Sequence, residues 1–441
     1  MIDKENIWGY HKTNNLTMYS AKEIERRQKE EKIMKKFKKV MLGAVATTLA
    51  VTSLAGCGKK ESAKETETKK QTETETATVE TTEKETTKSG ETEEFLIGSM
   101  GPLTGPAASY GTSVKQGAEI AIAEINEAGG VTVGDVNYTL ALAFEDDEAT
   151  EDKSIQAYNT LMDEGIQVMM GATTSGSTIA ITDLTADDGI LQITPSGSAP
   201  DCIQYDNAFR ICFSDPDQGI AMADYAMDVL GYTKIAVIYN NADDYSAGMD
   251  EAFETRIEEK GGEIVASESF TTGDTDFNTQ LTKIKGTDAE ALFIPAYYQD
   301  ITYITKQAAD MGMDLPLIGS DGWDGVLSTV SDPSVVEGAI FASPFCAAVD
   351  DPKVVSFVEA YEAAYSSTPD QFAADSYDAV YTIKAAMEQA GSIESEDLIA
   401  AMTEITVDGL TGESITFSAD GVPNKEIKYV EIKDGQYQYV E

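Results

Sequence analysis

Short apolar runs alternate with amphipathic stretches along most of the chain, and this alternation constrains the fold more than any other feature. The first example is a strand expected at 95–99, a Gly/Pro-rich loop at 101–111 and a helix at 114–125, whose apolar residues recur at helical spacing. Such alternation predicts βαβ units, in which right-handed crossovers place helices on both faces of a parallel sheet. The 441 residues are enough for two domains. We therefore expect an α/β protein with two doubly wound parallel-sheet lobes.

Two series of units define the expected lobes. The first series continues with strands at 138–144, 168–170 and 190–193 and helices at 155–162 and 179–186. The second follows 210–213, with helices at 219–230, 248–260 and 301–311 and strands at 235–239, 263–270, 291–295 and 316–319. We assign helices at 354–365, 376–390 and 398–402 to the first lobe, and expect final strands at 414–417 and 426–432. The expected first lobe is 95–214 plus 345–421, and the second is 215–344 plus 422–441.

The N-terminal region has the layout of an exported precursor. A basic segment, Met34–Lys39, precedes an apolar stretch, Val40–Ala55, that is too short to span a bilayer. The stretch ends in the sequence LAGC, which resembles the bacterial lipobox and implies lipid attachment at Cys57. We predict a lipoprotein signal peptide at 34–56; a short buried helix is the alternative. Residues 1–33 are expected to be an upstream extension from a misassigned start codon.

Residues 57–94 consist, after Cys57, almost wholly of Lys, Glu, Thr, Ser, Gln and Ala. Such a composition cannot bury a core, so we expect a disordered tether between the lipid and the folded part. The predicted location is the outer face of the cytoplasmic membrane, with contact to the membrane through the lipid alone.

Charge and histidine content exclude several classes of function. The chain has a net charge of −45, and such a field repels nucleic acid and anionic headgroups. The single histidine, His11, lies upstream of the signal peptide, so Ser/His/Asp triads, histidine-ligated zinc and a histidine base are excluded from the mature part. We expect no enzyme, no cofactor and no metal; a hydrolase that uses carboxylates alone is the alternative. Of the later cysteines, only Cys202 and Cys212 are close enough in sequence to suggest a bridge.

Three loops follow predicted strands and carry polar side chains. The loop at 171–178 has the spacing of a P-loop without its lysine, so it suits a carboxylate at a helix N-terminus; plain helix capping is the alternative. The loop at 194–198 lies at the same sheet edge and either faces the same ligand or is only a turn. The loop at 319–325 belongs to the second series. Its Asp321 can accept an ammonium group, and Trp323 either walls a pocket or lies in the core.

The region from Phe95 to the C-terminus resembles the leucine/isoleucine/valine-binding proteins of bacterial ABC importers. The resemblance is carried, in family order, by the segments GPLTGPAASYG, IAIAEINEAGG, VMMGATTSGST, GILQITPSGSAP, FRICFSDPDQG, IYNNADDYSAG, PAYYQD and LIGSDGWDG. It implies the type I periplasmic-binding fold, with two lobes joined by a three-strand hinge. It also implies a monomer that binds an amino acid and delivers it to permease subunits.

The resemblance also implies roles for individual residues. Ser175 and Ser198 are expected to bind the ligand carboxylate, and the Ser196 carbonyl and Asp321 its ammonium group. The remaining ligand-binding residues that we expect are Tyr110, Asp215, Tyr245, Tyr297, Trp323 and Phe372. Asp321 is often glutamate in branched-chain binders, and Trp323 replaces smaller residues. The ligand could therefore have a side chain that is larger than, or different from, that of leucine or valine. A ligand-sensing receptor domain and a binder of small amides or other solutes are the alternative functions.

Overall fold

The computed structural model describes residues 8–9, 19–20 and 92–440. The chain divides into two units, Met1–Glu85 and Thr86–Glu441. In the first, strand β1 (Trp8–Gly9) pairs antiparallel with β2 (Tyr19–Ser20). The predicted signal peptide, Cys57 and the tether up to residue 91 lie outside the described residues. Residues 92–94 already belong to a strand, so the expected tether end at 94 is wrong by three residues.

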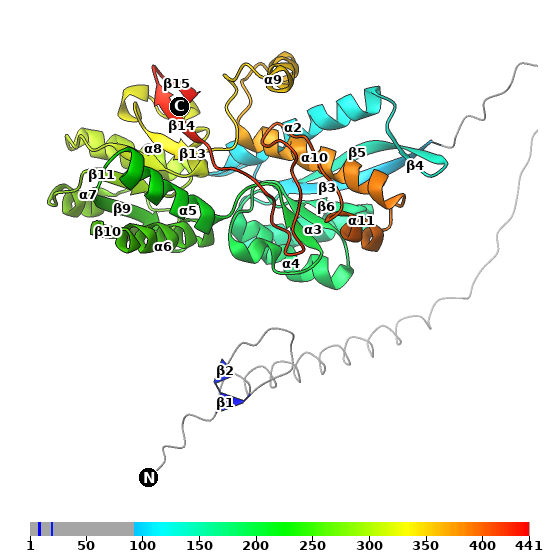
Figure 1. Cartoon of the computed structure of the whole chain (residues 1–441), viewed down its shortest axis with the longest axis horizontal. Helices are drawn as coiled ribbons and strands as arrows, with labels where there is room; N and C mark the ends of the chain where they lie inside the picture. Colours follow the sequence, from blue (N-terminus) through cyan, green and yellow to red (C-terminus); the bar gives the residue numbers. More distant parts are fainter. Residues whose placement is uncertain (1–7, 10–18, 21–91, 441) are drawn as a thin grey trace, which may run out of the picture. The chain divides into compact units, whose positions relative to one another are not determined.

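The second unit contains two α/β lobes, each built on one sheet (Figure 1). The six-stranded sheet has the order β4-β5-β3-β6-β7-β8, and all its pairs are parallel except β4 with β5. Its strands are β3 (Thr92–Gly101), β4 (Val131–Val133), β5 (Val136–Asp146), β6 (Val168–Met170), β7 (Gln192–Thr194) and β8 (Ala208–Arg210). Its helices are α2 (Ala108–Glu127), α3 (Glu151–Glu164), α4 (Ser175–Asp188), α9 (Pro352–Tyr365), α10 (Gln371–Ala390) and α11 (Ser395–Ala401), with the 3-10 turn η1 (Pro200–Ile203).

The seven-stranded sheet has the order β10-β9-β11-β12-β13-β14-β15 and is antiparallel only at its C-terminal edge. Its strands are β9 (Lys234–Asn240), β10 (Glu263–Phe270), β11 (Ala291–Ile294), β12 (Leu317–Gly319), β13 (Ile340–Ala342), β14 (Tyr429–Lys433) and β15 (Gln436–Tyr439). Its helices are α5 (Asp215–Asp224), the π-helical turn η2 (Tyr225–Val229), α6 (Asp244–Glu259), α7 (Asn278–Lys285) and α8 (Tyr298–Asp310). Three 3-10 turns follow β12: η3 (Asp321–Trp323), η4 (Val326–Ser328) and η5 (Pro333–Val335).

Local chemistry explains where several helices begin and pack. The Asp243 carboxylate accepts the Ser246 N–H at the start of α6, and the Asp370 carboxylate accepts the Ala373 N–H at the start of α10. Gly117 of α2 lies against α10, where a Cβ atom would be 2.0 Å from the Ala373 carbonyl oxygen. The long helices α2 and α10 therefore pack more closely than any side chain at 117 would permit.

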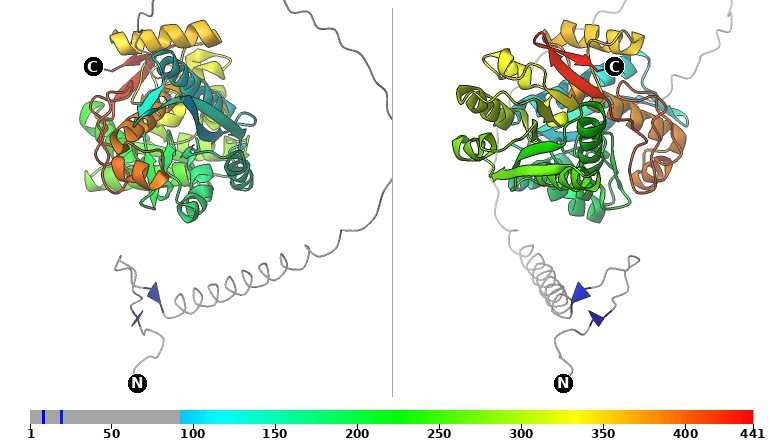
Figure 2. Two further views of the ribbon diagram at one scale, coloured as in Figure 1. Left: turned by 90° about the vertical axis from the view of Figure 1, so that its right-hand side faces the viewer. Right: turned by 60° about the vertical axis from the view of Figure 1, so that its left-hand side comes forward.

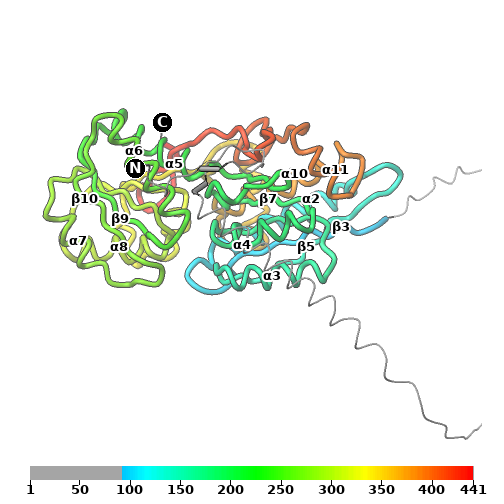
Figure 3. The backbone as a smooth tube through the Cα atoms, turned by 90° about the horizontal axis from the view of Figure 1, so that it is seen from below, coloured from blue at the N-terminus to red at the C-terminus, as the bar shows by residue number. Residues whose placement is uncertain are grey.

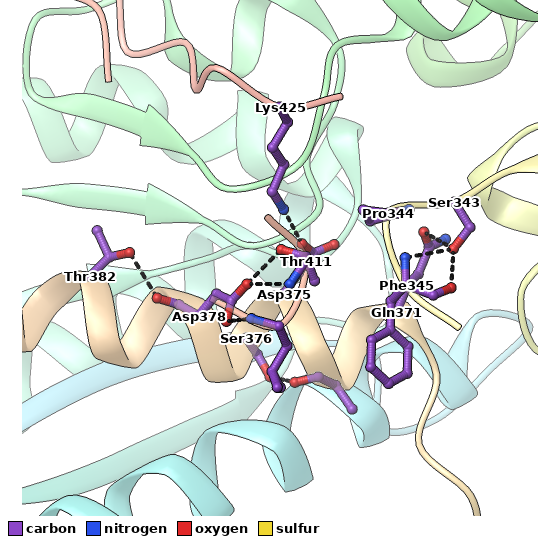
Figure 4. Close-up of polar contacts among 12 residues, drawn as sticks. Ser343, Pro344, Phe345, Gln371, Asp375, Ser376, Asp378, Thr382, Thr411 and Lys425 are labelled. Carbon is purple, nitrogen blue, oxygen red and sulfur yellow. Dashed lines mark hydrogen bonds and ion pairs between the residues drawn. The ribbon is translucent and has the colours of Figure 1, made fainter. Parts of the chain in front are cut away.

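The chain crosses between the lobes three times: from β8 to α5, from β13 to α9, and along residues 402–428 before β14, which Figure 3 follows from orange to red. The third crossing is fixed to α10 by buried polar groups (Figure 4). Lys425 pairs with Asp375 at 2.6 Å, and these side chains are 1% and 3% exposed. Asp378 accepts the Thr411 N–H at 2.9 Å and the Leu410 N–H at 2.7 Å.

Some expected elements are wrong or incomplete. Helix α2 begins at Ala108, inside the expected loop, and α4 begins at Ser175, also inside an expected loop. The expected strand at 414–417 is absent; this part of the crossing makes only single bridges, Ile415 with Val407 and Phe417 with Pro423. Strands β4, β13 and β15 and helix α7 were missed; the strands have only three or four residues and the helix eight, which is too short to establish an apolar period. Within the described residues, no helix has both the length and the apolar character needed to cross a bilayer.

Candidate functional site

The loops singled out in the sequence meet between the lobes and enclose a cavity of about 10 Å³, which has room for about one water molecule. We call it the cleft cavity. It is lined by Tyr110, Thr173, Thr174, Ser196, Tyr245, Tyr297, Asp321, Gly322 and Phe372. In the first lobe, these loops follow β6 and β7, and in the second they follow β11 and β12. Ligands of open α/β sheets bind at these carboxyl ends of strands.

The first lobe contributes hydroxyl groups and the N-terminus of α4. Thr174 is the residue before α4, and Ser175 is its first residue. The Ser175 Oγ accepts the N–H groups of Ser198 at 3.2 Å and Ala199 at 3.1 Å. The Ser196 hydroxyl donates to the Thr173 carbonyl at 2.6 Å. This wall presents partial positive charge, which favours an anionic group.

Arg210 supports this wall from behind, a role that sequence reasoning missed. Its guanidinium is 1% exposed and donates to the carbonyls of Ser198, Ala199 at 3.0 Å and Pro200 at 3.3 Å. A planar guanidinium can hold several carbonyls at once, so Arg210 fixes the loop after β7.

The second lobe contributes Asp321 and stacked aromatic rings. Asp321 is 5% exposed, its Oδ1 accepts the Tyr245 hydroxyl at 2.6 Å, and its N–H donates to Gln218 at 3.1 Å. Burial raises the pKa of Asp321 to about 6, while the hydrogen bond from Tyr245 and the nearby Gln218 amide oppose the rise. Tyr245 stacks on Tyr297 with ring centroids 4.9 Å apart. This wall therefore presents a buried acid beside an apolar surface.

Asp215 is a second buried acid near the cleft cavity. Its side chain is 0% exposed, and neither carboxylate oxygen has a hydrogen-bond partner among the described residues. Burial raises the pKa of Asp215 well above its usual value; the nearby Ser198 hydroxyl lowers it, and the charge of Asp321 raises it further. The Ser198 Oγ and the Gln218 Nε2 are also buried without a partner in the described part of the chain. Unpartnered buried groups of this kind are rare and mark a place where a ligand can bind.

Direct hydrogen bonds hold the two walls together. The Tyr110 hydroxyl, from α2 of the first lobe, donates to the Gly322 carbonyl at 2.6 Å and accepts the Tyr298 N–H at 2.9 Å in the second. The Gln371 side chain of α10 donates to the Asp321 carbonyl at 2.6 Å. The lobes are therefore in contact across the cleft cavity, and a solute larger than water requires them to separate.

The structure brings together most of the predicted ligand-binding residues. Six line the cleft cavity: Tyr110, Ser196, Tyr245, Tyr297, Asp321 and Phe372. Ser175, Ser198 and Asp215 are buried just behind its lining. Thr173, Thr174 and Gly322 were missed, although they lie within loops that the sequence had marked. Gln218 of α5 was also missed, and it lies outside those loops.

The expectation that Trp323 lines the site is wrong. Trp323 is fully buried in the core of the second lobe, and its Nε1 donates to the Ile294 carbonyl at 2.8 Å. Its indole fills the space beside Gly319, where a Cβ atom would lie 2.0 Å from the Trp323 Nε1.

The cysteines and metal-ligating side chains form no further site in the described region. Cys202 and Cys212 are both free, so the bridge that their spacing suggested is absent. Among residues 92–440, no group of three His, Cys, Asp or Glu side chains is placed to hold a metal ion.

A larger cavity, of about 760 Å³, begins near the cleft cavity at Asp324. Its lining has three acidic side chains and no Lys, Arg or His. By contrast, a single acid, Asp321, lines the cleft cavity beside the N-terminus of α4, so the cleft cavity is the better candidate for a zwitterion despite its small volume.

Residues 94–436 match the family model of the periplasmic binding proteins. A Brucella melitensis protein, "Leu/Ile/Val-binding protein homolog 3", is 31% identical over 309 residues, which are 70% of this chain and 82% of that protein. The solved substrate-binding protein LivJ of Streptococcus pneumoniae, in complex with isoleucine, is 30% identical with a TM-score of 0.73; the match covers 78% of this chain and 99% of LivJ. A substrate-binding protein from Desulfitobacterium hafniense in complex with leucine is 26% identical with a TM-score of 0.67, over 79% of this chain and all of that one.

Proposed function

From the premise that this chain belongs to the periplasmic binding protein family, we propose that it is the substrate-binding protein of an ABC importer and captures an amino acid in the cleft. One observation carries the proposal: the cleft cavity has a helix N-terminus on one wall and the buried Asp321 on the other. These walls match the carboxylate and the ammonium group of one small zwitterion. Relatives whose names or titles give isoleucine or leucine as the ligand support the amino-acid class.

Each end of the ligand has named partners in this proposal. The carboxylate binds at the N-terminus of α4, close to Thr174 and Ser175, with the Ser198 hydroxyl beside it. The ammonium group binds Asp321 and the Ser196 carbonyl, and the Asp215 carboxyl group, which has no hydrogen-bond partner among the described residues, lies nearby. A buried charge is tolerated only when it is paired and hydrogen-bonded, so the two walls select for both ends of the ligand at once.

The rings of Tyr110, Tyr297 and Phe372 set the character of the ligand side chain. Tyr110 lies 4.2 Å from Phe372 and 5.6 Å from Tyr297, measured between ring centroids. Such aromatic walls stabilise an apolar side chain by excluding water from it. We therefore propose a branched-chain or related apolar amino acid.

Capture requires a hinge motion between the two lobes. The first lobe comprises residues 95–214 and 345–421, and the second comprises residues 215–344 and 422–441. The three crossings form the hinge, and opening breaks the Tyr110 and Gln371 contacts between the walls. Closure over the ligand re-forms these contacts and buries both ligand charges. The protein acts as a monomer, performs no catalysis and presents its closed form to permease subunits.

The N-terminal sequence completes the proposal. The signal at 34–56 exports the protein, and lipid on Cys57 holds it at the outer face of the cytoplasmic membrane. Labelling of expressed protein with a radioactive fatty acid, with Cys57→Ser as the control, tests the anchor separately from ligand binding.

Titration calorimetry on the full chain tests the ligand class. Leucine, isoleucine and valine are compared with leucinamide, which lacks the carboxylate, and with 4-methylpentanoic acid, which lacks the ammonium group. We expect at least one amino acid to bind and both truncated analogues to bind about a hundredfold more weakly. Equal binding of leucinamide and leucine contradicts a role for the α4 N-terminus, and equal binding of the acid contradicts a role for Asp321.

A further inference from the structure

The larger cavity of about 760 Å³ shares no lining residue with the cleft cavity. We call it the hinge cavity, because residues 345–348 of the β13–α9 crossing line it. Helix α2 of the first lobe supplies Thr112 and Ser113, and α9 supplies Val358 and Tyr361. Both views of Figure 2 show α9 and the C-terminal strands along the same edge of the molecule, and Tyr437 of β15 completes the wall.

The three carboxyl side chains that line the hinge cavity have no basic partner there. Asp324, Glu362 and Asp370 line it, and no Lys, Arg or His does. Asp324 is only 4% exposed, and its Oδ1 has no hydrogen-bond partner among the described residues. A buried carboxylate oxygen without a partner is costly, and a cationic donor in the cavity would satisfy it.

Helix capping explains only part of this acidic group. At the start of α10, the Asp370 Oδ1 accepts the Ala373 N–H at 3.1 Å, and its Oδ2 accepts the Ser113 hydroxyl at 2.6 Å. The Asp324 Oδ2 accepts the Gln371 N–H at 2.9 Å. Both oxygens of Asp370 are thus used within the fold, whereas the Asp324 Oδ1 remains for another partner.

The other walls are apolar. Phe341, Phe345 and Val358 line the cavity, with the rings of Tyr361 and Tyr437. A ligand that fits has a cationic head and an apolar body. A zwitterion fits poorly, because its carboxylate would meet only acidic groups.

The two cavities are joined by one short turn. Asp321 lines the cleft cavity, Asp324 lines the hinge cavity, and the Asp324 N–H donates to the Asp321 carbonyl at 3.0 Å. Gln371, from the other lobe, bonds to both ends of this turn. A ligand that contacts Asp324 and the first lobe together therefore favours the closed arrangement of the lobes.

We propose that the hinge cavity is a second ligand site, which takes an aromatic or branched aliphatic primary amine as a cation. The ammonium group binds the Asp324 Oδ1, and the apolar body packs on Phe345, Tyr361 and Tyr437. Because the site contains residues of both lobes, its ligand strengthens binding in the cleft, and the cleft ligand strengthens binding of the amine.

Titration calorimetry of the full chain with benzylamine, and with benzyl alcohol as its uncharged analogue, tests the site. We expect benzylamine to bind with a stoichiometry of one, and benzyl alcohol to bind at least about tenfold more weakly. Asp324→Asn keeps an acceptor for the Gln371 N–H and removes the charge, and it should weaken benzylamine at least about tenfold. Asp420→Asn makes the same change on the exposed surface and should leave the affinity within about twofold.

A second variant keeps the test decisive if Asp324→Asn does not fold. Thr112 is partly exposed on α2, so Thr112→Phe places a ring in the cavity without burying a new polar group, and it should abolish benzylamine binding. No heat with benzylamine, or unchanged binding to Thr112→Phe, overturns the proposal. Loss of benzylamine binding when leucine saturates the cleft also overturns it, because one shared site would then explain both ligands. The benzylamine measurement needs no cleft ligand, so its failure leaves the proposed amino-acid function standing.

Discussion

Replacement of Asp321 by alanine should affect ligand affinity and protein stability in opposite directions. The carboxylate is almost fully buried and receives one side-chain hydrogen bond, from Tyr245. In the proposed complex it is the main partner of the ligand ammonium group. Removal of one partner of a buried ion pair costs about 3 to 5 kcal/mol, which corresponds to a loss of affinity of roughly a hundredfold to several thousandfold.

The unliganded protein should respond differently. Burial raises the pKa of Asp321 from 3.8 to about 6 in the closed arrangement. Each unit corresponds to about 1.4 kcal/mol, so the ionised group destabilises the closed form by roughly 3 kcal/mol at pH 7, and opening of the lobes removes this cost. Replacement by alanine removes this cost. It also removes the hydrogen bond from Tyr245, which offsets about 1 to 2 kcal/mol of the gain in stability. Tyr245 also keeps the Ser320 hydroxyl at 2.6 Å as a partner. The variant should therefore be as stable as the wild type or more stable by about 1 to 2 kcal/mol.

Calorimetry with leucine, isoleucine and valine measures the affinity, and urea unfolding without ligand measures the stability. Asp420→Ala, at an exposed position, serves as the matched control and should change neither quantity appreciably. An affinity within threefold of the wild type would refute the role of Asp321 in binding. A loss of more than 2 kcal/mol of unliganded stability would show that its hydrogen bonds outweigh its desolvation.

Three further predictions follow from the same contacts. Amino-acid affinity should fall about tenfold between pH 7 and pH 5 in calorimetry, because Asp321 titrates near pH 6 and its protonated form cannot pair with an ammonium group; a flat profile contradicts this. Tyr110→Phe removes the hydroxyl that bonds Gly322 across the lobes, so stopped-flow fluorescence should show ligand release about tenfold faster with little change in the association rate. Lys425→Met leaves Asp375 buried without its cation and should cost about 3 to 5 kcal/mol in urea unfolding, and Lys425→Met with Asp375→Asn should recover most of the loss.

Much of the fold was predictable because its strands are short, apolar and separated by amphipathic helices. Strand β6 (Val168–Met170) and strand β10 (Glu263–Phe270) begin and end at the predicted residues. Helix starts were less predictable, because the first turn of a helix at a ligand site is rich in Ser, Thr and Gly and reads as a loop. Ser175 is such a residue: it was assigned to a loop, yet it opens α4.

The sequence predicted which loops form the candidate site, but it predicted less well which side chains of those loops face the cleft. A loop sequence places Asp321 and Trp323 together, but it does not say which side chain faces the cleft. The 3-10 turn at Asp321–Trp323 directs Asp321 to the cleft cavity, while Trp323 packs beside Gly319 in the core. Arg210 was missed for a related reason, since its role depends on carbonyls that come close only after folding.

The two buried acids of the cleft suggest why the lobes should open without ligand at neutral pH. Burial raises the pKa values of Asp215 and Asp321. The charge of Asp321 raises the pKa of Asp215 further, and the charge of Asp375 does the same for Asp321. Closure at pH 7 therefore either leaves these charges desolvated or requires a proton, and the contacts of Tyr110 and Gln371 offset only a few kcal/mol of that cost. A ligand ammonium group between the walls removes the repulsion and replaces lost hydration. The same acids that would bind the ligand thus oppose closure in its absence. Because closure is unfavourable without a ligand, the closed form indicates that the cleft is filled.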